Sequence, residues 1–380
     1  MQTESIIAYK KKDPIDENSD YLNKQIITYL GNKRGLLNFV NKGLTIVKRR
    51  LSKRKLNIFD VFSGSGIVSR FFKQHAKKLI VNDLEKYSEV INRCYLSNKS
   101  EINLNYLEQL YYDITFKLNN EPLFKGLIAN LYAPQNDNKI KKGERVFYTS
   151  RNAMYLDTAR HYIESVPTEF KNYLLAPLLS EASIHANTSG VFKGFYKNAE
   201  SGIGKFGGSK GDALLRILGS IELPFPIFSN FSCQTEIYRG DSNQIAKTIS
   251  EVDLAYIDPP YNQHPYGSNY FMLNLLIDYC EPKEISEISG IPIDWNRSDY
   301  NKKSNSIIAF TNLMTSLKAK YLLISFNSEG FISQKEMINI LKKMGNVEVL
   351  ETKYNTFRGS RNLRNRTIHI KEFLYLLEKR

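Results

Sequence analysis

The sequence predicts an α/β protein built on a doubly wound, largely parallel sheet, and three observations support this prediction. Short apolar stretches rich in strand-forming residues alternate with stretches of helical periodicity. Three of the apolar stretches end in an aspartate, at Asp83, Asp241 and Asp258. Another runs directly into a Gly-x-Gly turn at Gly64 and Gly66. Since ligands bind outside the carboxyl ends of the strands in such sheets, we expect a functional site at that edge.

Composition narrows the class of protein. The 380 residues, 42% hydrophobic and 24% charged, are enough for a large core. No apolar run reaches the roughly 18 residues of a membrane span, and the first residues carry no secretory signal. The three cysteines and five histidines are scattered, so we expect a cytoplasmic, bacterial-type protein without a metal site. The net charge of +14 favours a polyanionic partner, although a merely basic protein fits the charge equally well.

The first element with a functional signal lies near the N-terminus. Tyr29, Gly31 and Lys33 precede an amphipathic helix that ends at about Val47. A glycine before a lysine at a helix start permits close approach to a ligand, but an ordinary helix start is the simpler interpretation. The basic cluster over 48–55 is either a solvated helix end, which we favour slightly, or a phosphate-contacting rim.

A strand over 57–62, the glycine turn and a helix over 67–78 form the first unit of the sheet. The third glycine of a dinucleotide fingerprint and a Walker-type loop are both missing, which disfavours NAD and ATP. A second strand over 79–83 ends in an acid, the place from which ribose hydroxyls are bound in this architecture. We therefore expect Asp83 to hold a ribose, with Glu85 as the alternative; Asp83 also suits the N-cap of a helix over 84–96.

Residues 101–230 have a different character. Helices are predicted over 105–118, 151–166 and 168–184. The stretch 185–211 then interleaves aromatic residues with basic ones, a pattern that suits contact with nucleic acid. The basic candidates there are Lys193, Lys197 and Lys205, and a surface loop of no special role is an equally good interpretation.

The sheet resumes with strands over 235–241 and 252–257, separated by a helix over 242–249. Further on we expect a strand over 321–326, a helix over 334–344 and two final strands over 347–354 and 367–377. The connection between those last strands is strongly basic. Four arginines fall within nine residues there, beside an aromatic ring, and the candidate nucleic-acid contacts are Phe357, Arg358, Arg361 and Arg364.

The strand over 252–257 is followed directly by Asp258, Pro259, Pro260 and Tyr261. The prolines fix their own φ angles and donate no N–H, so this corner is stiff. A carboxylate, a rigid carbonyl and an aromatic ring can together hold a flat heterocycle that bears an exocyclic amine. The simpler alternative is a strand that ends in a proline turn.

Together these motifs resemble those of the Dam-like, alpha-group adenine-specific DNA methyltransferases, particularly those of restriction–modification systems. The matching elements follow in order: Gly31 and Lys33, then 60–66, Asp83 and 258–261. The resemblance implies a seven-stranded, Rossmann-like sheet that binds S-adenosylmethionine (AdoMet). It assigns 1–100 and 231–380 to the catalytic domain and 101–230 to an inserted, mainly helical target-recognition domain.

The resemblance also implies roles for individual residues. The target adenine would be flipped out of double-stranded DNA, since its amine is unreachable within the stack. Asp258 and the Pro259 carbonyl would accept hydrogen bonds from that amine, while Tyr261, with Phe357 as a second partner, would stack on the base. The implied AdoMet-binding set is Tyr29, Gly31, Lys33, Asp60, Phe62, Gly64, Gly66, Asp83, Asp241, Ser242 and Asp258.

Other functions remain open at this point. Cytosine N4-methylation, RNA methylation and protein-glutamine methylation all need only an amine beside a planar group. A non-catalytic nucleic-acid-binding module is disfavoured, because three acids at the binding edge would repel phosphate. A separately acting restriction endonuclease is a further candidate partner, and we expect a monomer or a weak dimer.

Overall fold

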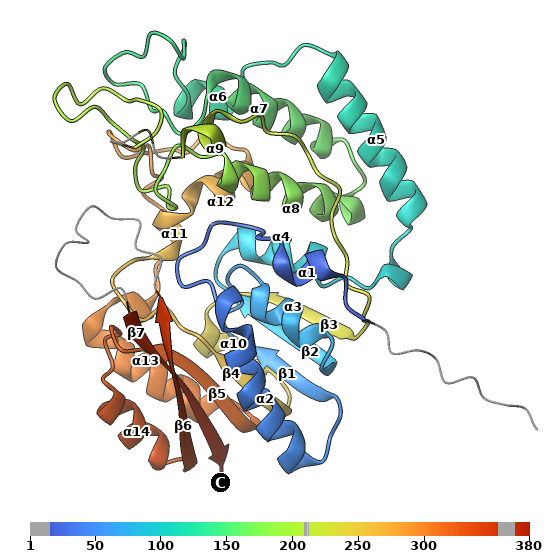
Figure 1. Ribbon diagram of the computed structural model, residues 1–380, viewed down its shortest axis with the longest axis vertical. Helices are drawn as coiled ribbons and strands as arrows, with labels where there is room; N and C mark the ends of the chain where they lie inside the picture. The colour runs from blue at the N-terminus through green and yellow to red at the C-terminus, as the bar shows by residue number, and fades with distance from the viewer. Residues whose placement is uncertain (1–15, 209–210, 212, 356–368) are drawn as a thin grey trace, which may run out of the picture.

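A seven-stranded sheet forms the centre of the protein, in the order β3-β2-β1-β4-β5-β7-β6 (Figure 1). The computed structural model describes residues 16–208, 211, 213–355 and 369–380. The first five strands are parallel, and β7 is antiparallel to both β5 and β6. The predicted sheet is therefore confirmed, and its strands are β1 (Leu56–Asp60), β2 (Ala76–Asp83), β3 (Gln234–Arg239), β4 (Val252–Ile257), β5 (Ala319–Asn327), β6 (Gly345–Asn355) and β7 (His369–Lys379).

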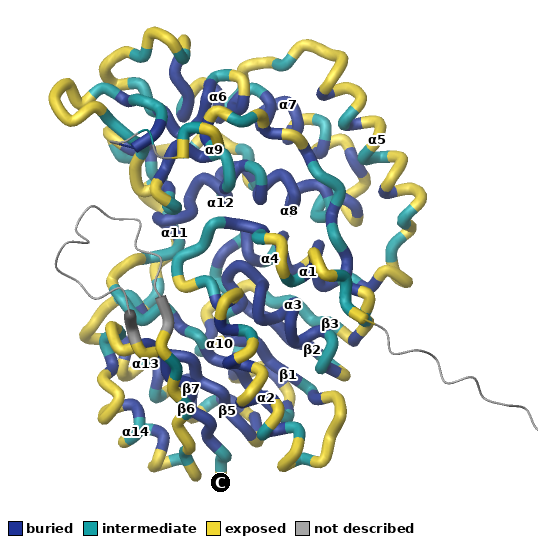
Figure 2. The backbone as a smooth tube through the Cα atoms, viewed as in Figure 1, coloured by how far each residue is buried: buried dark blue, intermediate teal, exposed yellow. Residues whose placement is uncertain are grey.

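The central strands read as continuous apolar runs because both of their faces are covered. Alternate residues of β1 belong to different cores: Ile58 packs with α2 (Leu37–Leu51) and α3 (Ile67–Lys73), and Phe59 packs toward the opposite face. That second face is covered by α10 (Ser242–Thr248), α13 (Lys303–Ser316) and α14 (Gln334–Lys342). Figure 2 shows the resulting buried band along the strands.

Neighbouring strands bring distant loops to one edge. Strand β1 lies between β2 and β4, with Asp60 opposite Val81 on one side and Tyr256 on the other. Because all three strands run in the same direction, the segments that follow them meet at their common carboxyl end. The glycine turn, Asp83 and Asp258 are therefore neighbours in space although they are far apart in sequence.

The second part of the molecule is helical, and it lies above the sheet in Figure 1. Its helices are α5 (Leu104–Asn120), α6 (Leu127–Tyr132), α7 (Ser150–Glu164), α8 (Thr168–Ile184) and α9 (Leu214–Leu218). All of them except α9 share one hydrophobic core with α4 (Lys86–Tyr95) and α12 (Phe271–Asp278), two helices that come after β2 and after β4 in the sequence. Residues 101–230 thus contain several helices, and most of these helices are joined to α4 and α12 through a common core.

Several boundaries differ from the predicted ones. The helix expected over 67–78 ends at Lys73, because residues from Ala76 onward pair with β1 and Lys78 also pairs with β3. These long-range ladder hydrogen bonds override the local helical pattern. Helices α12 and α13 have no counterpart among the predicted elements. The sequence of α13 is rich in Ser, Asn, Thr and Ile, which are weak helix formers, but packing of Phe310, Leu313 and Met314 stabilises it.

The remaining short elements are α1 (Ser19–Asn23), α11 (Tyr266–Asn269) and three 3₁₀ turns, η1 (Arg34–Leu36), η2 (Lys99–Glu101) and η3 (Asp299–Asn301). Within the part of the chain that the structure describes, every helix is too short or too polar to cross a bilayer.

Candidate active site

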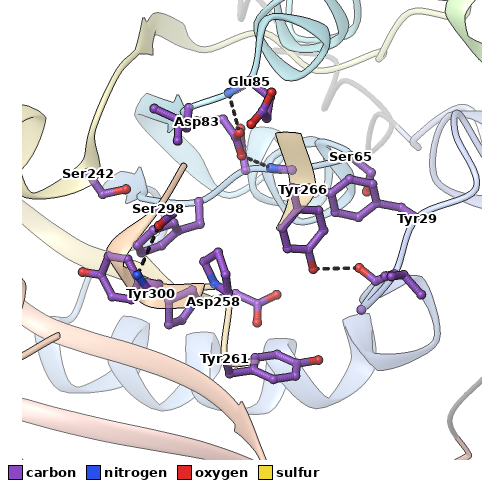
Figure 3. A pocket seen from close by; sticks show the side chains of 18 of the residues that line it. Tyr29, Ser65, Asp83, Glu85, Ser242, Asp258, Tyr261, Tyr266, Ser298 and Tyr300 are labelled. Carbon is purple, nitrogen blue, oxygen red and sulfur yellow. Dashed lines mark hydrogen bonds between the residues drawn. The ribbon is translucent and has the colours of Figure 1, made fainter. Parts of the chain in front are cut away.

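A cavity opens at the carboxyl edge of the sheet, where the loops that follow β1, β2, β3 and β4 meet the N-terminal loop (Figure 3). It encloses about 900 Å³, including the space at its opening. Most of the predicted catalytic and cofactor residues line it: Tyr29, Gly31, Lys33, Phe62, Gly64, Asp83, Asp241, Ser242, Asp258, Pro259, Pro260 and Tyr261. The structure therefore brings together two motifs, at 64 and at 258, that are almost two hundred residues apart.

Two predicted residues, Asp60 and Gly66, lie behind the cavity wall instead of on it. Asp60 is fully buried; its Oδ2 accepts a hydrogen bond from Ser69 Oγ at 2.5 Å, and burial raises its pKa to about 7. Gly66 begins α3 with φ +73°, and a Cβ there would lie 2.8 Å from Asn92 Oδ1. Both residues shape the turn after β1, and direct contact with a ligand is not supported for either.

Asp83 ties the turn after β1 to the end of β2. Its Oδ2 accepts a hydrogen bond from the backbone N–H of Gly64 at 2.7 Å, and its Oδ1 accepts one from Glu85 N–H at 3.0 Å. Gly64 has φ +52°, and a Cβ there would lie 2.8 Å from the ring of Tyr29. A glycine is therefore needed both for the turn and for the space beside that ring.

Glu85 is the second carboxylate at this end of β2, and only 2% of it is exposed. Its Oε2 accepts hydrogen bonds from Asn274 Nδ2 at 2.6 Å and Asn296 Nδ2 at 3.1 Å. Burial raises the pKa of Glu85 to about 7, against the opposing effect of the Asn274 hydrogen bond. Glu85 lines the cavity, and among the described residues none donates a hydrogen bond to its Oε1.

Asp258 belongs to a buried group of three charges. Lys33 Nζ lies 3.1 Å from Asp258 Oδ1 and 2.9 Å from Oε1 of Glu372, a residue near the start of β7. Burial raises the pKa of Asp258 to about 6; the ammonium of Lys33 opposes this shift and the carboxylate of Glu372 adds to it. Burial also works against a charged Lys33, but the two carboxylates outweigh it and hold the pKa of Lys33 well above its usual value.

Tyr261 is held firmly beside Asp258. Its ring packs edge-on against Phe326 at 5.5 Å between centroids, and Lys33 Nζ lies 5.6 Å from its centroid. A Cβ at Gly31 would lie 3.3 Å from the Tyr261 hydroxyl, so the N-terminal loop passes close to the ring. In Figure 3 the carboxylate of Asp258 points toward the space between Tyr261 and Tyr266.

Two tyrosines that were not among the predicted site residues fix the N-terminal loop. The backbone N–H of Leu30 donates to the Tyr270 hydroxyl at 2.7 Å, and the Tyr266 hydroxyl donates to the Leu30 carbonyl at 3.1 Å. Their rings also stack on Tyr29, each with centroids 4.9 Å apart. The polar and aromatic loop after Tyr261 was the sequence signal that could have identified both of them.

Another wall of the cavity comes from η3. Tyr300 packs edge-on against Phe62 at 5.1 Å between centroids, and its hydroxyl donates to Asn243 Oδ1 at 2.8 Å. Asp241 caps the N-terminus of α10 by accepting from Gln244 N–H at 3.0 Å. Nothing in the sequence around 298–301 indicates this role, because tertiary contacts with α10, α13 and the loop after β4 bring the segment to the site.

The predicted DNA-contacting lysines lie in a loop that is joined to the edge of the site. Phe192 N–H donates to the Asn269 carbonyl at 2.7 Å, which fastens the segment carrying Lys193 to α11. Lys193 also contributes to lowering the pKa of His264, although burial is the larger cause. Lys197 Nζ lies 4.8 Å from the centroid of the Phe195 ring. The other predicted contacts, Phe357, Arg358, Arg361 and Arg364, lie outside the described residues.

A second, larger cleft of about 1470 Å³ adjoins the first. It lies between the N-terminal loop and the helical part, and Tyr29 and Asn32 line both hollows. Arg34 and Arg216 add positive charge to its walls. In the described part of the chain, no three His, Cys, Asp or Glu residues are grouped as metal ligands.

Comparison with known proteins identifies the family. Residues 29–340 match the family model described as D12 class N6 adenine-specific DNA methyltransferase. The type II methyltransferase M.NlaIII of Neisseria lactamica is 31% identical over 372 residues, which cover 93% of this chain and 99% of that protein. M.CviAII of Paramecium bursaria Chlorella virus 1 is 30% identical over 342 residues, covering 88% and 93%. Modification methylase StsI of Streptococcus sanguinis is 28% identical over 372 residues, covering 93% of this chain and 52% of that protein.

The match thus spans the glycine turn, both acids at the end of β2 and the proline corner at Asp258. The chain belongs to the D12 class N6 adenine-specific DNA methyltransferases, and it is an enzyme that methylates adenine in DNA.

Proposed function

We propose that the methyl donor is S-adenosylmethionine, bound between the glycine turn and Glu85, and that the acceptor is an adenine rotated out of duplex DNA and held at Asp258. The observation that carries this proposal is the single cavity shared by Gly64 and Asp258. Donor and acceptor must meet within a few ångströms for direct transfer, and one cavity with both motifs on its walls permits this.

The residues present fit AdoMet at the β1–β2 side of the cavity. The bare backbone of Gly64 leaves space that a side chain would fill. The free Oε1 of Glu85 would accept from a ribose hydroxyl, with Asp83 holding the loop that presents it. The rings of Phe62 and Tyr300 would flank the nucleobase, near Asp241 and Ser242. Bound there, AdoMet supplies a methyl group made electrophilic by its attachment to a sulfonium.

Asp258 and its neighbours would bind and orient the target base. The carboxylate and the Pro259 carbonyl accept hydrogen bonds from the N6 amine, which localises a nitrogen lone pair that is otherwise shared with the ring. Pro260 stiffens the corner, and Tyr261 supplies a flat face on which the purine stacks. Removal of the base from the helix costs a few kcal/mol, which stacking and the two hydrogen bonds offset. Positioning then provides much of the rate acceleration.

The second cleft would guide the DNA toward the cavity. Arg34 on its wall and the lysines at 193, 197 and 205 are suited to phosphate contacts, and residues 101–230 would supply target recognition. The relatives are named type II methyltransferases and modification methylases, which supports a role as the modification enzyme of a restriction–modification system. The cognate endonuclease would act as a separate protein, and the methyltransferase would work as a monomer or weak dimer.

The proposal is tested by expressing the protein in a host that lacks adenine methylation and sequencing the host DNA with detection of modified bases. We expect N6-methyladenine at one short recurring sequence, and an Asp258→Ala variant should leave the host DNA unmodified. Methylation of cytosine N4, or adenine methylation without any sequence preference, would contradict the proposal.

A further inference from the structure

Glu372 is the least expected member of the site. It lies near the start of β7, is 2% exposed and is absent from the residues that line the cavity. Strand β7 runs antiparallel to β5, so its beginning lies at the same edge as the ends of the parallel strands. There Glu372 Oε1 contacts Lys33 Nζ at 2.9 Å and accepts a hydrogen bond from Ser325 Oγ at 3.0 Å. Glu372 is therefore linked to Asp258 by contacts through Lys33, and its charge also acts on Asp258 across that short distance.

A buried ammonium that is shared by two carboxylates differs from a simple ion pair. Lys33 Nζ has three donor hydrogens and lies between the two carboxylates, closer to Glu372 Oε1 at 2.9 Å than to Asp258 Oδ1 at 3.1 Å. The ammonium then approaches Asp258 Oδ1 at 3.1 Å without forming a hydrogen bond of good geometry, since this oxygen has no hydrogen-bond partner among the described residues. The charge of Lys33 thus stabilises the Asp258 carboxylate while the acceptor capacity of that carboxylate stays free.

We propose that Glu372 is a positioning residue for methyl transfer, which holds the ammonium of Lys33 so that Asp258 stays an unoccupied acceptor for the target amine. The inference rests on the proposed role of Asp258. In the absence of Glu372 the ammonium would turn toward Asp258 alone, and the target amine would have to compete with it for the carboxylate.

The charge of Asp258 depends on every group that faces it. These groups are Lys33 before η1, Glu372 on β7, Asp60 on β1, Tyr256 on β4, Tyr261 after it and Tyr266 on α11. The tyrosines stay neutral because burial raises their pKa values, and Lys33 stays charged. The charge of Glu372 raises the pKa of Asp258, so removal of that charge should lower this pKa. The pH at which activity is lost on the acid side should therefore move downward.

The test measures single-turnover methyl transfer at saturating DNA and AdoMet from about pH 5 to about pH 9, with AdoMet affinity measured on the same samples. For Glu372→Gln we expect a rate at the plateau that is lower on the order of tenfold, an acid limb at lower pH and an AdoMet dissociation constant within about threefold of wild type. Glu372→Asp keeps the charge, so its acid limb should stay in place. Glu348→Gln is the matched control, since Glu348 pairs with Arg50 on the surface of β6.

Ser325→Ala provides a second route, because it removes the other hydrogen bond to Glu372 without a change of charge. It should lower the plateau rate and leave the acid limb unmoved, and it keeps the proposal testable if Glu372→Gln does not fold. An unchanged rate and acid limb in Glu372→Gln would overturn the inference, as would equal rate losses in Glu372→Gln and Glu372→Asp with both limbs unmoved. Asp258→Ala measured in parallel separates the two proposals: full turnover there would refute the role of Asp258 itself.

Discussion

The backbone N–H of Gly64 donates a hydrogen bond to Asp83 Oδ2 at 2.7 Å, and this bond joins the turn after β1 to the end of β2. The Oδ1 atom of the same carboxylate accepts from Glu85 N–H at 3.0 Å. Both oxygens of Asp83 are therefore engaged in holding backbone. Glu85 also lines the cavity from this end of β2, and its Oε1 has no hydrogen-bond donor among the described residues.

Replacement of Asp83 should disturb the AdoMet side of the cavity through the loss of this turn. Hydrogen bonds to a charged group contribute about 1.5–3 kcal/mol each. We therefore expect Asp83→Ala to weaken AdoMet binding by roughly tenfold or more and to lower the melting temperature. Calorimetric titration and thermal denaturation measure both quantities. An unchanged dissociation constant would leave Glu85 as the residue that binds the donor.

Glu85→Gln should weaken AdoMet binding and remove its pH dependence. A carboxylate accepts a ribose hydroxyl better than a neutral carboxyl does, and burial raises the pKa of Glu85 to about 7. Wild-type affinity should therefore fall as the pH drops through about 7, and the variant should show a flat profile. Titrations with AdoMet at a series of pH values decide this; a wild-type affinity that is constant over that range would count against the role of Glu85.

Glu85→Gln should weaken AdoMet binding, but it should make the folded protein more stable. The pKa of Glu85 is higher in the folded protein than its value of about 4.3 in an unfolded chain. Its stabilising contribution is thus complete below about pH 4 and is lost as the pH rises through about 7. Without AdoMet, Glu85→Gln should melt at a higher temperature than wild type at about pH 8.5, with a smaller difference at about pH 5.5. Equal melting temperatures at the higher pH would contradict the burial of this charge.

Tyr261 should be needed for its ring and not for its hydroxyl. Stacking of a base on an aromatic side chain contributes about 1–3 kcal/mol. We expect Tyr261→Ala to lower kcat/KM for DNA by roughly tenfold or more, and Tyr261→Phe to retain most of the activity. A fluorescent adenine analogue at the target position reports extrusion of the base directly. Equal activity of Tyr261→Ala and Tyr261→Phe would contradict a stacking role for the Tyr261 ring.

The lysines of the loop beside α11 should contribute to DNA affinity in a salt-dependent way. Replacement of Lys193 and Lys197 by Ala should weaken DNA binding and reduce the slope of log affinity against log salt by about 1 for each phosphate that the protein no longer neutralises. Lys320→Ala is a suitable control, since Lys320 is exposed at the amino end of β5, away from the cavity. The sequence predicts the same behaviour for Arg358 and Arg361. If the salt slopes of these variants equal that of the control, the residues do not contact DNA phosphates.

Much of the site could be predicted because its signals are local. A parallel sheet places the ends of its strands at one edge, so the acids at 83, 241 and 258 and the turn at Gly64 had to be neighbours once the strands were recognised. Glu372 could not be found in this way. It lies near the beginning of an antiparallel strand, and only the pairing of β7 with β5 brings it to the same edge.

The remaining differences also have tertiary causes. Tyr300 joins the cavity because α13 packs on the sheet, and the local sequence of that helix gives little sign of a helix at all. Asp60 matches its motif, yet the strand carries it behind the wall, where it contacts Ser69. A motif therefore located the loop that matters but did not decide which of its side chains faces the ligand.

The most direct test of the central claim is single-turnover methyl transfer by Asp258→Ala, with the AdoMet dissociation constant measured on the same preparation. Lys33 keeps Glu372 as a partner in this variant, so the fold should tolerate the change. We predict a rate lower by at least about 100-fold, the scale seen when one group that stabilises a transition state is removed, with AdoMet affinity nearly unchanged. Turnover close to that of wild type would contradict the assignment of Asp258 as the acceptor for the target amine.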